Sequence, residues 1–325
     1  MHLKIDIERW PLKVPFRITG YTLTAADVIV VTLTEDGFSG RGEAAGVHYR
    51  GENPESMARQ LEGVRPLLTG GLRHETARSL LPPGGARNAL DCALWDLEAR
   101  RRGVPAWQLA ELGAPGPLPT TYTVSADTAE AMARAAASYE GAKHLKLKLT
   151  GDRDVARLRA VRAARPDAWI GVDANQAYDV VTLRSLIPDL LEADVRLIEQ
   201  PVRVGCEREL AQFDSPIPLA ADESVQSMED LPNVVGLFDV INIKLDKCGG
   251  LTEALAMVAE VRRLGMKPMV GCMAGTSLAM APACLVGAQC DLVDLDGAMF
   301  LAEDRRPAAL YKHGTVYCPD GWGLP

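Results

Sequence analysis

The feature that most constrains the fold of this chain is a regular alternation of apolar segments and helical patterns after residue 119. Each of the eight apolar segments is long enough for one β-strand. They cover residues 120–124, 145–149, 169–172, 195–198, 218–221, 240–243, 267–270 and 292–295. Strands that alternate with helices are typical of parallel α/β folds, which form either a closed barrel or an open doubly wound sheet.

Charged residues at the ends of these strands distinguish the two folds. They are Lys148, Asp173, Glu199, Asp222, Lys244 and Asp294. The first five are separated by 25, 26, 23 and 22 residues, and the last lies two such intervals further on. A barrel collects functional side chains at the C-terminal ends of all its strands, whereas an open sheet binds ligands at one switch point. The regular spacing therefore predicts a barrel.

The first hundred residues have a different pattern, which predicts a separate α+β unit. A β-branched run at residues 29–34 precedes Glu35-Asp36-Gly37, a hairpin signal. Helical patterns follow at residues 54–68 and 86–101. Residues 113–119 are rich in glycine and proline, which break regular structure, so we place the domain boundary there.

Composition excludes several classes of protein. The net charge of -8 argues against a nucleic-acid partner, because phosphate binding requires a basic surface. The seven cysteines include no CxxC pair, which favours a reducing, cytoplasmic location over a disulfide framework or a zinc site. The N-terminal residues lack the apolar core of a signal peptide. Residues 268–290 carry no charge, but their small and polar residues indicate a buried strand and helix, and no membrane partner is expected.

Asp173, Glu199 and Asp222 form a candidate metal site. They end consecutive strand units, so a barrel would bring their carboxylates together. A carboxylate behind an apolar strand is costly to bury alone, and a divalent cation would compensate its charge. All-oxygen ligation favours Mg²⁺, or alternatively Mn²⁺, over zinc. The alternative is that each acid caps a helix or pairs with a lysine.

Lys146 and Lys148 alternate with leucines and therefore share one strand face, which in a barrel is the interior. Ammonium groups about 6.6 Å apart repel by about 2.5 kcal/mol at an effective dielectric near 20. This repulsion would lower a lysine pKa from about 10.4 toward about 8.5, where the amine can act as a general base. Lys244 ends a strand nearly opposite Lys148, and two amines flanking one metal-bound substrate could invert a stereocentre. A Schiff-base lysine is the rival interpretation, although it explains neither the three acids nor the second lysine.

Three further acidic residues lie near strand ends. Asp294 and Asp296 follow the last strand, and two carboxylates on one face could hold a cationic substrate group such as an amine. An acidic turn before Gly297 explains the same residues, so both interpretations remain open. Asp246 and Lys247, which follow Lys244, are expected to form a local ion pair.

Five ordered motifs resemble the enolase superfamily, muconate-lactonizing subgroup. They are Lys146-Leu-Lys148, Val172-Asp-Ala-Asn175, Ile198-Glu-Gln-Pro201, Ala221-Asp-Glu-Ser224 and Ile243-Lys-Leu-Asp-Lys-Cys-Gly-Gly250. The resemblance implies a (β/α)₇β TIM-like barrel, residues 117–299, beneath an N-terminal α+β capping domain, residues 1–116, that residues 300–325 complete. It also implies Mg²⁺ on the three acids, with Lys148 and Lys244 as opposed acid/base groups. The shared chemistry is removal of a proton α to a carboxylate through an enediolate.

Within this subgroup, Asp294-Leu-Asp296 resembles the signature of dipeptide epimerases, in which the two acids hold the substrate's α-ammonium. The resemblance to L-Ala-D/L-Glu epimerases implies an isomerase of cell-wall peptide recycling. Those enzymes read the glutamate side chain with an arginine, and here Leu23 occupies that position. We therefore expect Tyr21 and Leu23, with Arg17 as a substitute cation, to set an altered specificity. The alternatives are muconate cycloisomerase, o-succinylbenzoate synthase, N-acylamino acid racemase or a non-catalytic barrel. We also expect a homo-oligomer.

Overall fold

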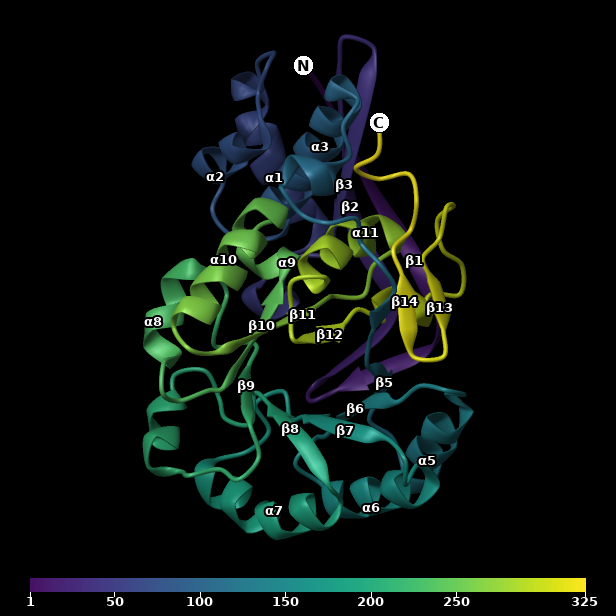
Figure 1. The fold of residues 1–325 in the computed structure, drawn as a ribbon, viewed down its shortest axis with the longest axis vertical. Helices are drawn as coiled ribbons and strands as arrows, with labels where there is room; N and C mark the ends of the chain where they lie inside the picture. Colours follow the sequence, from purple (N-terminus) through teal and green to yellow (C-terminus); the bar gives the residue numbers. More distant parts are fainter.

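The computed structural model describes all 325 residues, and its N-terminal part is a three-stranded antiparallel sheet covered by helices (Figure 1). The strands are β1 (His2–Ile18), β2 (Tyr21–Glu35) and β3 (Phe38–Ala44). The helices are α1 (Pro54–Val64), α2 (Ala77–Leu80), α3 (Gly85–Arg102) and α4 (Ala106–Leu109), with short 3₁₀ turns η1 (His48–Arg50), η2 (Arg65–Leu67) and η3 (His74–Thr76). Asp36 and Gly37 have φ of 51° and 83°, so the predicted hairpin turn is confirmed.

Helix α3 packs directly on β3, and two glycines allow this close approach. A Cβ atom on Gly40 would lie 2.2 Å from the backbone nitrogen of Leu97, and one on Gly42 would lie 2.1 Å from the carbonyl oxygen of Ala89. Real Cβ atoms do not approach so closely, so any larger residue would push the helix off the sheet. The N-terminal domain thereby acquires its own core between α3, α1 and the sheet.

Eight parallel strands between Tyr122 and Asp294 form the predicted barrel (Figure 1). Its strands are β5 (Tyr122–Val124), β6 (His144–Lys148), β7 (Trp169–Asp173), β8 (Val195–Glu199), β9 (Leu219–Ala221), β10 (Val240–Lys244), β11 (Lys267–Gly271) and β12 (Leu292–Asp294). The helices are α5 (Ala129–Ser138), α6 (Asp154–Ala164), α7 (Val180–Glu192), α8 (Leu231–Val234), α9 (Leu245–Cys248), α10 (Leu251–Arg263) and α11 (Ser277–Gly287), with 3₁₀ turns η4 (Glu207–Gln212) and η5 (Met228–Asp230).

The barrel closes between its first and last strands. The backbone nitrogen of Thr121, just before β5, donates to the carbonyl oxygen of Val293 on β12 over 3.0 Å. The Thr120 hydroxyl accepts from the backbone nitrogen of Leu295 over 2.9 Å and extends this junction. An open doubly wound sheet would leave both edges unpaired, so the prediction of a barrel is confirmed.

Side-chain alternation divides the barrel interior into an apolar floor and a polar mouth. Leu197, Ala220, Val240 and Met269 form a small buried apolar cluster, and Trp169 and Leu292, the first residues of β7 and β12, pack against it. Because alternate residues of a strand face the same side, Glu199 follows Leu197 on the interior face, and Asp222 follows Ala220. Charged groups therefore gather where the strands end, above a packed floor.

The C-terminal segment returns from the barrel to the N-terminal domain. It contains η6 (Gly297–Phe300), β13 (Leu310–Lys312) and β14 (Thr315–Tyr317), and β14 pairs with β4 (Leu118–Pro119). The Arg305 guanidinium donates to Glu43 Oε2 over 3.0 Å and also contacts Glu8. Trp322 Nε1 donates to the Arg41 carbonyl over 2.9 Å. These polar contacts tie the two domains together across their junction.

The uncharged stretch at residues 268–290 forms the rest of β11 and then α11, as predicted. Helix α11 has 11 residues and packs in the core. None of the helices has both the length and the apolar character needed to cross a bilayer.

Candidate active site

The three acids predicted as metal ligands lie together at the mouth of the barrel. Asp173 ends β7, Glu199 ends β8 and Asp222 follows β9, and one oxygen from each lies within 4.8 Å of the others. All three carboxylates are almost completely buried. A hard divalent cation with oxygen ligands fits this donor set.

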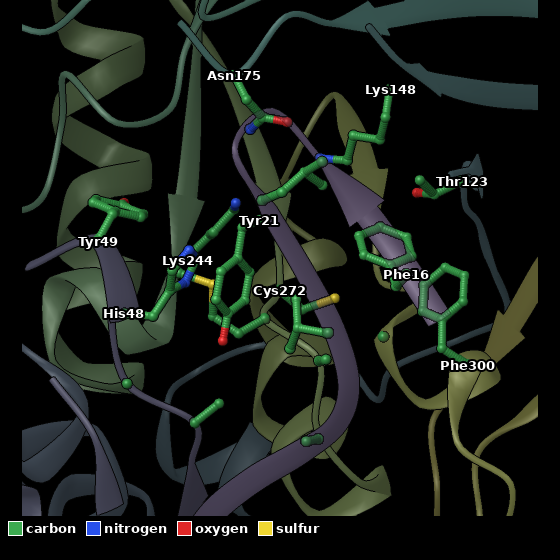
Figure 2. A pocket seen from close by; sticks show the side chains of 18 of the residues that line it. Phe16, Tyr21, His48, Tyr49, Thr123, Lys148, Asn175, Lys244, Cys272 and Phe300 are labelled. Carbon is green, nitrogen blue, oxygen red and sulfur yellow. The ribbon is translucent and has the colours of Figure 1, made fainter. Parts of the chain in front are cut away.

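Lysines reach these acids from both sides of the barrel. Lys148 on β6 donates to Asp173 Oδ2 over 2.6 Å, and Lys244 on β10 donates to Asp222 Oδ2 over 2.7 Å. Strands β6 and β10 are four positions apart in an eight-stranded barrel, so the two lysines come from opposite walls. Figure 2 shows them entering the cavity from different directions.

The environment of Lys146 corrects the predicted role of charge repulsion. Its ammonium lies 2.7 Å from Asp294, 2.8 Å from Glu199 and 3.3 Å from Asp173. Burial lowers the pKa of Lys146, but these carboxylates together raise it well above its usual value. The expectation that Lys146 acts on Lys148 mainly by repulsion was wrong, because it counted the neighbouring ammonium and not the acids that neutralise it.

The acids themselves are shifted in opposite directions by their surroundings. Burial and the nearby Asp173 raise the pKa of Glu199 to about 7. Burial also acts to raise the pKa of Asp222, but Lys244 and Lys247 hold it well below its usual range. Two ammonium groups thus donate to Asp222, whereas Glu199 Oε1 accepts from the Asn242 amide over 2.8 Å.

Lys247 belongs to this site, although we predicted only a local ion pair for it. The predicted ion pair with Asp246 is not formed. Instead, the Lys247 ammonium donates to Asp222 Oδ1 over 2.6 Å. The one-turn helix α9 turns Lys247 back toward the strand that carries Lys244. A signal was available, since residues three apart on a helical turn share a face whereas adjacent residues do not.

Asp246 instead holds the loop that follows β3. Its Oδ1 accepts from the backbone nitrogens of Ala45 and Gly46, both over 2.9 Å. The same loop continues into His48 and Tyr49, which line the cavity. Asp246 therefore couples the end of β10 to a capping-domain loop over the site.

Burial raises the pKa of Asp246 to about 6, which predicts a pH effect on stability. Its unfolded pKa is about 3.9, so between about pH 4 and pH 6 the unfolded chain loses its proton first. The free energy of unfolding should fall by about 3 kcal/mol over this range as the pH rises. Asp246→Asn keeps the acceptor oxygen but cannot ionise. Urea unfolding should therefore show a shallower fall for the variant, and equal pH slopes would contradict the assignment.

A cavity of about 360 Å³ lies between the barrel mouth and the capping domain (Figure 2). Tyr21 and Leu23 from the β1–β2 hairpin line it. The ring of Tyr21 stacks on His48 at 4.6 Å, which joins the hairpin to the loop after β3. The Thr19 hydroxyl contacts the carbonyl oxygens of Leu149 and Ala174 at 3.0 and 3.1 Å and docks the hairpin tip on the barrel.

Arg17 does not line this cavity, so its predicted contact with substrate is not supported. Its guanidinium lies 2.8 Å from Asp127 and faces a shallow hollow on the other side of the hairpin. Successive strand residues point to opposite faces, and Ile18 takes the inward position. No arginine contributes to the cavity wall.

Asp294 and Asp296 both line the cavity but have different partners. Each oxygen of Asp294 has a partner, since Oδ1 accepts from the Thr121 hydroxyl and Oδ2 accepts from Lys146. Asp296 Oδ2 accepts from the Thr123 backbone nitrogen over 2.6 Å, which leaves Oδ1 available. Burial and the charge of Asp294 raise the pKa of Asp296 to about 7.

An aromatic pair closes the same end of the cavity. Phe16 from the capping hairpin and Phe300 from η6 lie 4.8 Å apart between ring centroids, with Thr123 nearby in Figure 2. A substrate group at this end would contact the rings of Phe16 and Phe300 and the Oδ1 atom of Asp296.

Family comparisons agree with this architecture. Residues 1–112 match the N-terminal domain of the mandelate racemase/muconate lactonizing enzyme family, and residues 128–324 match the enolase C-terminal domain-like family. The chain is 39% identical to the L-Ala-D/L-Glu epimerase of Escherichia coli K12, over 97% of this chain and 99% of the relative. It is 36% identical to the N-acetyl-D-glutamate racemase of a Pseudoalteromonas species, over 89% and 92%.

A solved structure is similar over nearly the whole chain. It is an enolase family member from Agrobacterium tumefaciens with homology to dipeptide epimerases, and it contains sodium and L-Ala-L-Glu. The sequences are 43% identical, and the TM-score is 0.95 over 99% of this chain and 98% of the other.

Proposed function

The chain belongs to the mandelate racemase/muconate lactonizing enzyme family of the enolase superfamily, and from this membership we propose that it is a metal-dependent dipeptide epimerase. The isomerase would invert the Cα atom of the C-terminal residue of a dipeptide. The observation that carries this proposal is the placement of Lys148 and Lys244 on opposite barrel walls, each within 2.7 Å of a carboxylate of the acid triad.

Asp173, Glu199 and Asp222 would hold the cation, which we propose to be Mg²⁺, with Mn²⁺ as an alternative. A bound Mg²⁺ would supply positive charge to the substrate carboxylate as it becomes an enediolate. Lys148 and Lys244 would divide the proton transfer. One neutral amine would take the Cα proton as the C–H bond breaks, and the ammonium on the other wall would return a proton to the opposite face.

The remaining cavity residues would position the two ends of the dipeptide. We propose that Lys146 stays charged and neutralises the acids around it, because its three contacts hold it as an ammonium. Asp296 Oδ1 would accept from the substrate's α-ammonium. Tyr21 and Leu23 would contact the side chain of the epimerised residue, and their uncharged surfaces favour neutral second residues.

Proton NMR of dipeptides in D₂O with Mg²⁺ tests this function. The panel should include L-Ala-L-Glu and L-Ala dipeptides with aliphatic and aromatic second residues. We expect deuterium to replace the Cα proton of the second residue, with appearance of the other epimer. Absence of exchange in every dipeptide would exclude the proposed reaction.

The engagement of Asp294 favours a second candidate, an N-acylamino acid racemase. Because both oxygens of Asp294 already accept hydrogen bonds from Lys146 and Thr121, Asp296 Oδ1 is the one oxygen of the two carboxylates without a partner for an ammonium to replace. The apolar pair Phe16 and Phe300 would suit an acyl group. The similarity to a racemase of an N-acetylated amino acid also supports this candidate.

Asp296→Asn separates the two candidates. A dipeptide would lose its charged partner, so its KM should rise by roughly ten-fold or more, since a hydrogen bond to a charged group contributes about 1.5–3 kcal/mol. For an N-acyl substrate the KM should change by far less than this. Asp127→Asn, which alters an exposed acid outside the cavity, is the matched control. Equal KM changes for both substrate types would contradict a role for Asp296 in holding an ammonium.

A further inference from the structure

Lys247 is the most completely buried charged side chain in contact with the acid triad. It is 2% exposed, and its ammonium donates to three oxygens: Asp222 Oδ1 at 2.6 Å, the Asp222 carbonyl at 2.6 Å and the Asn242 carbonyl at 2.9 Å. An ammonium has three donors, and all are used here. Two of the acceptors are backbone atoms, so Lys247 has one defined position.

Lys244 contacts the same carboxylate in a different way. Its ammonium donates to Asp222 Oδ2 over 2.7 Å, which is its one hydrogen bond within the protein. Lys244 and Asp222 line the cavity, and Lys247 does not. The two oxygens of Asp222 therefore have different partners, since Oδ1 accepts from the buried Lys247 and Oδ2 accepts from the cavity-lining Lys244.

From these contacts we propose that Lys247 is a positioning residue that fixes Asp222 with Oδ2 toward the cavity. A cation and Lys244 would both contact this oxygen. With a cation bound to Oδ2, the Lys244 ammonium would be directed toward the substrate. The inference rests on the proposed function for the role of Lys244. The contacts of Lys247 with Asp222 do not depend on the proposed function.

Asp173, at the end of β7 and two strands from β9, has a comparable pair of contacts. The backbone nitrogen of Asn175 donates to Oδ1 over 2.9 Å, and Lys148 donates to Oδ2 over 2.6 Å. In both acids a fixed donor holds one oxygen, and a cavity-lining lysine contacts the other. The repetition supports a shared use of Oδ2 by cation and lysine at both ends of the triad.

Isothermal titration of the full chain with Mg²⁺ alone tests the proposal through two substitutions. Simple electrostatics predicts tighter Mg²⁺ binding for both Lys244→Met and Lys247→Met, because each removes a positive charge near the same carboxylate. If Lys247 positions Asp222, the changes in Mg²⁺ affinity of the two variants should instead have opposite signs. We expect Lys244→Met to bind Mg²⁺ about ten-fold more tightly and Lys247→Met about ten-fold more weakly, as expected for one charged hydrogen bond gained or lost.

Equal tightening in both variants, or unchanged affinity in Lys247→Met, would overturn the proposal. If Lys247→Met does not fold, Lys247→Arg retains the charge with a planar fork that does not match the three acceptors, and it should also bind Mg²⁺ more weakly. Wild-type affinity in Lys247→Arg, or no tightening in Lys244→Met, would each contradict the inference. Failure of the wild-type chain to bind Mg²⁺ would instead count against the proposed function itself.

Discussion

Replacing either Lys148 or Lys244 with methionine is expected to lower kcat for dipeptide inversion by about 10³-fold, within the range of general acid–base catalysis. Each lysine would act on one face of the substrate, so the remaining lysine cannot complete the inversion. Chiral chromatography of the two epimers over time measures this loss.

Lys267→Met provides a matched control for these variants. Lys267 is an exposed lysine that begins β11, at the end of the barrel away from the cavity. The kcat of the Lys267→Met variant should therefore equal that of the wild-type chain. Retention of more than about a tenth of the wild-type kcat in Lys148→Met or Lys244→Met would be inconsistent with general acid–base catalysis by that lysine.

Asp222→Asn is expected to have the largest effect on stability. It removes the charge that compensates Lys244 and Lys247, both buried. Breaking a buried ion pair from one side costs about 3–5 kcal/mol, because the partner charge stays buried. Unfolding in guanidinium chloride should show this loss, and Mg²⁺ binding should disappear with it. Asp189→Asn, in a partly exposed pair with Arg159, should be nearly neutral. A stable Asp222→Asn that binds Mg²⁺ normally would contradict the assigned site.

The barrel and the location of its acids could be predicted because they follow from one periodicity. Interior residues alternate along each strand, and the charged ones recur at strand ends, so Asp173, Glu199 and Asp222 had to meet once the barrel closed. The long strand β1 was harder to predict from the sequence than the barrel strands. Pro11 and Pro15 interrupt it, and its register with β2 shifts between Pro11 and Phe16, which masks the usual alternation.

The errors concern contacts that depend on three-dimensional placement. Lys146 meets Asp294, which is 148 residues away in the sequence, so no local pattern showed that its charge is neutralised. Arg17 and Ile18 are neighbours, and which one points into the cavity depends on the register of the β1–β2 hairpin. Lys247 was missed because the one-turn helix α9 places it three residues after Lys244, where it reaches Asp222 instead of Asp246.

The most direct test of the central claim, that Lys148 and Lys244 act on opposite faces of one Cα atom, is epimer-specific exchange. The substrate is a dipeptide that the wild-type chain epimerises. Each of its two epimers is incubated separately in D₂O with Mg²⁺ and either the Lys148→Met or the Lys244→Met variant, and deuteration of the Cα atom is followed by NMR. Each variant should exchange one epimer without inverting it, and the two variants should exchange opposite epimers. Exchange of the same epimer by both variants, or of both epimers by one variant, would contradict two-sided proton transfer.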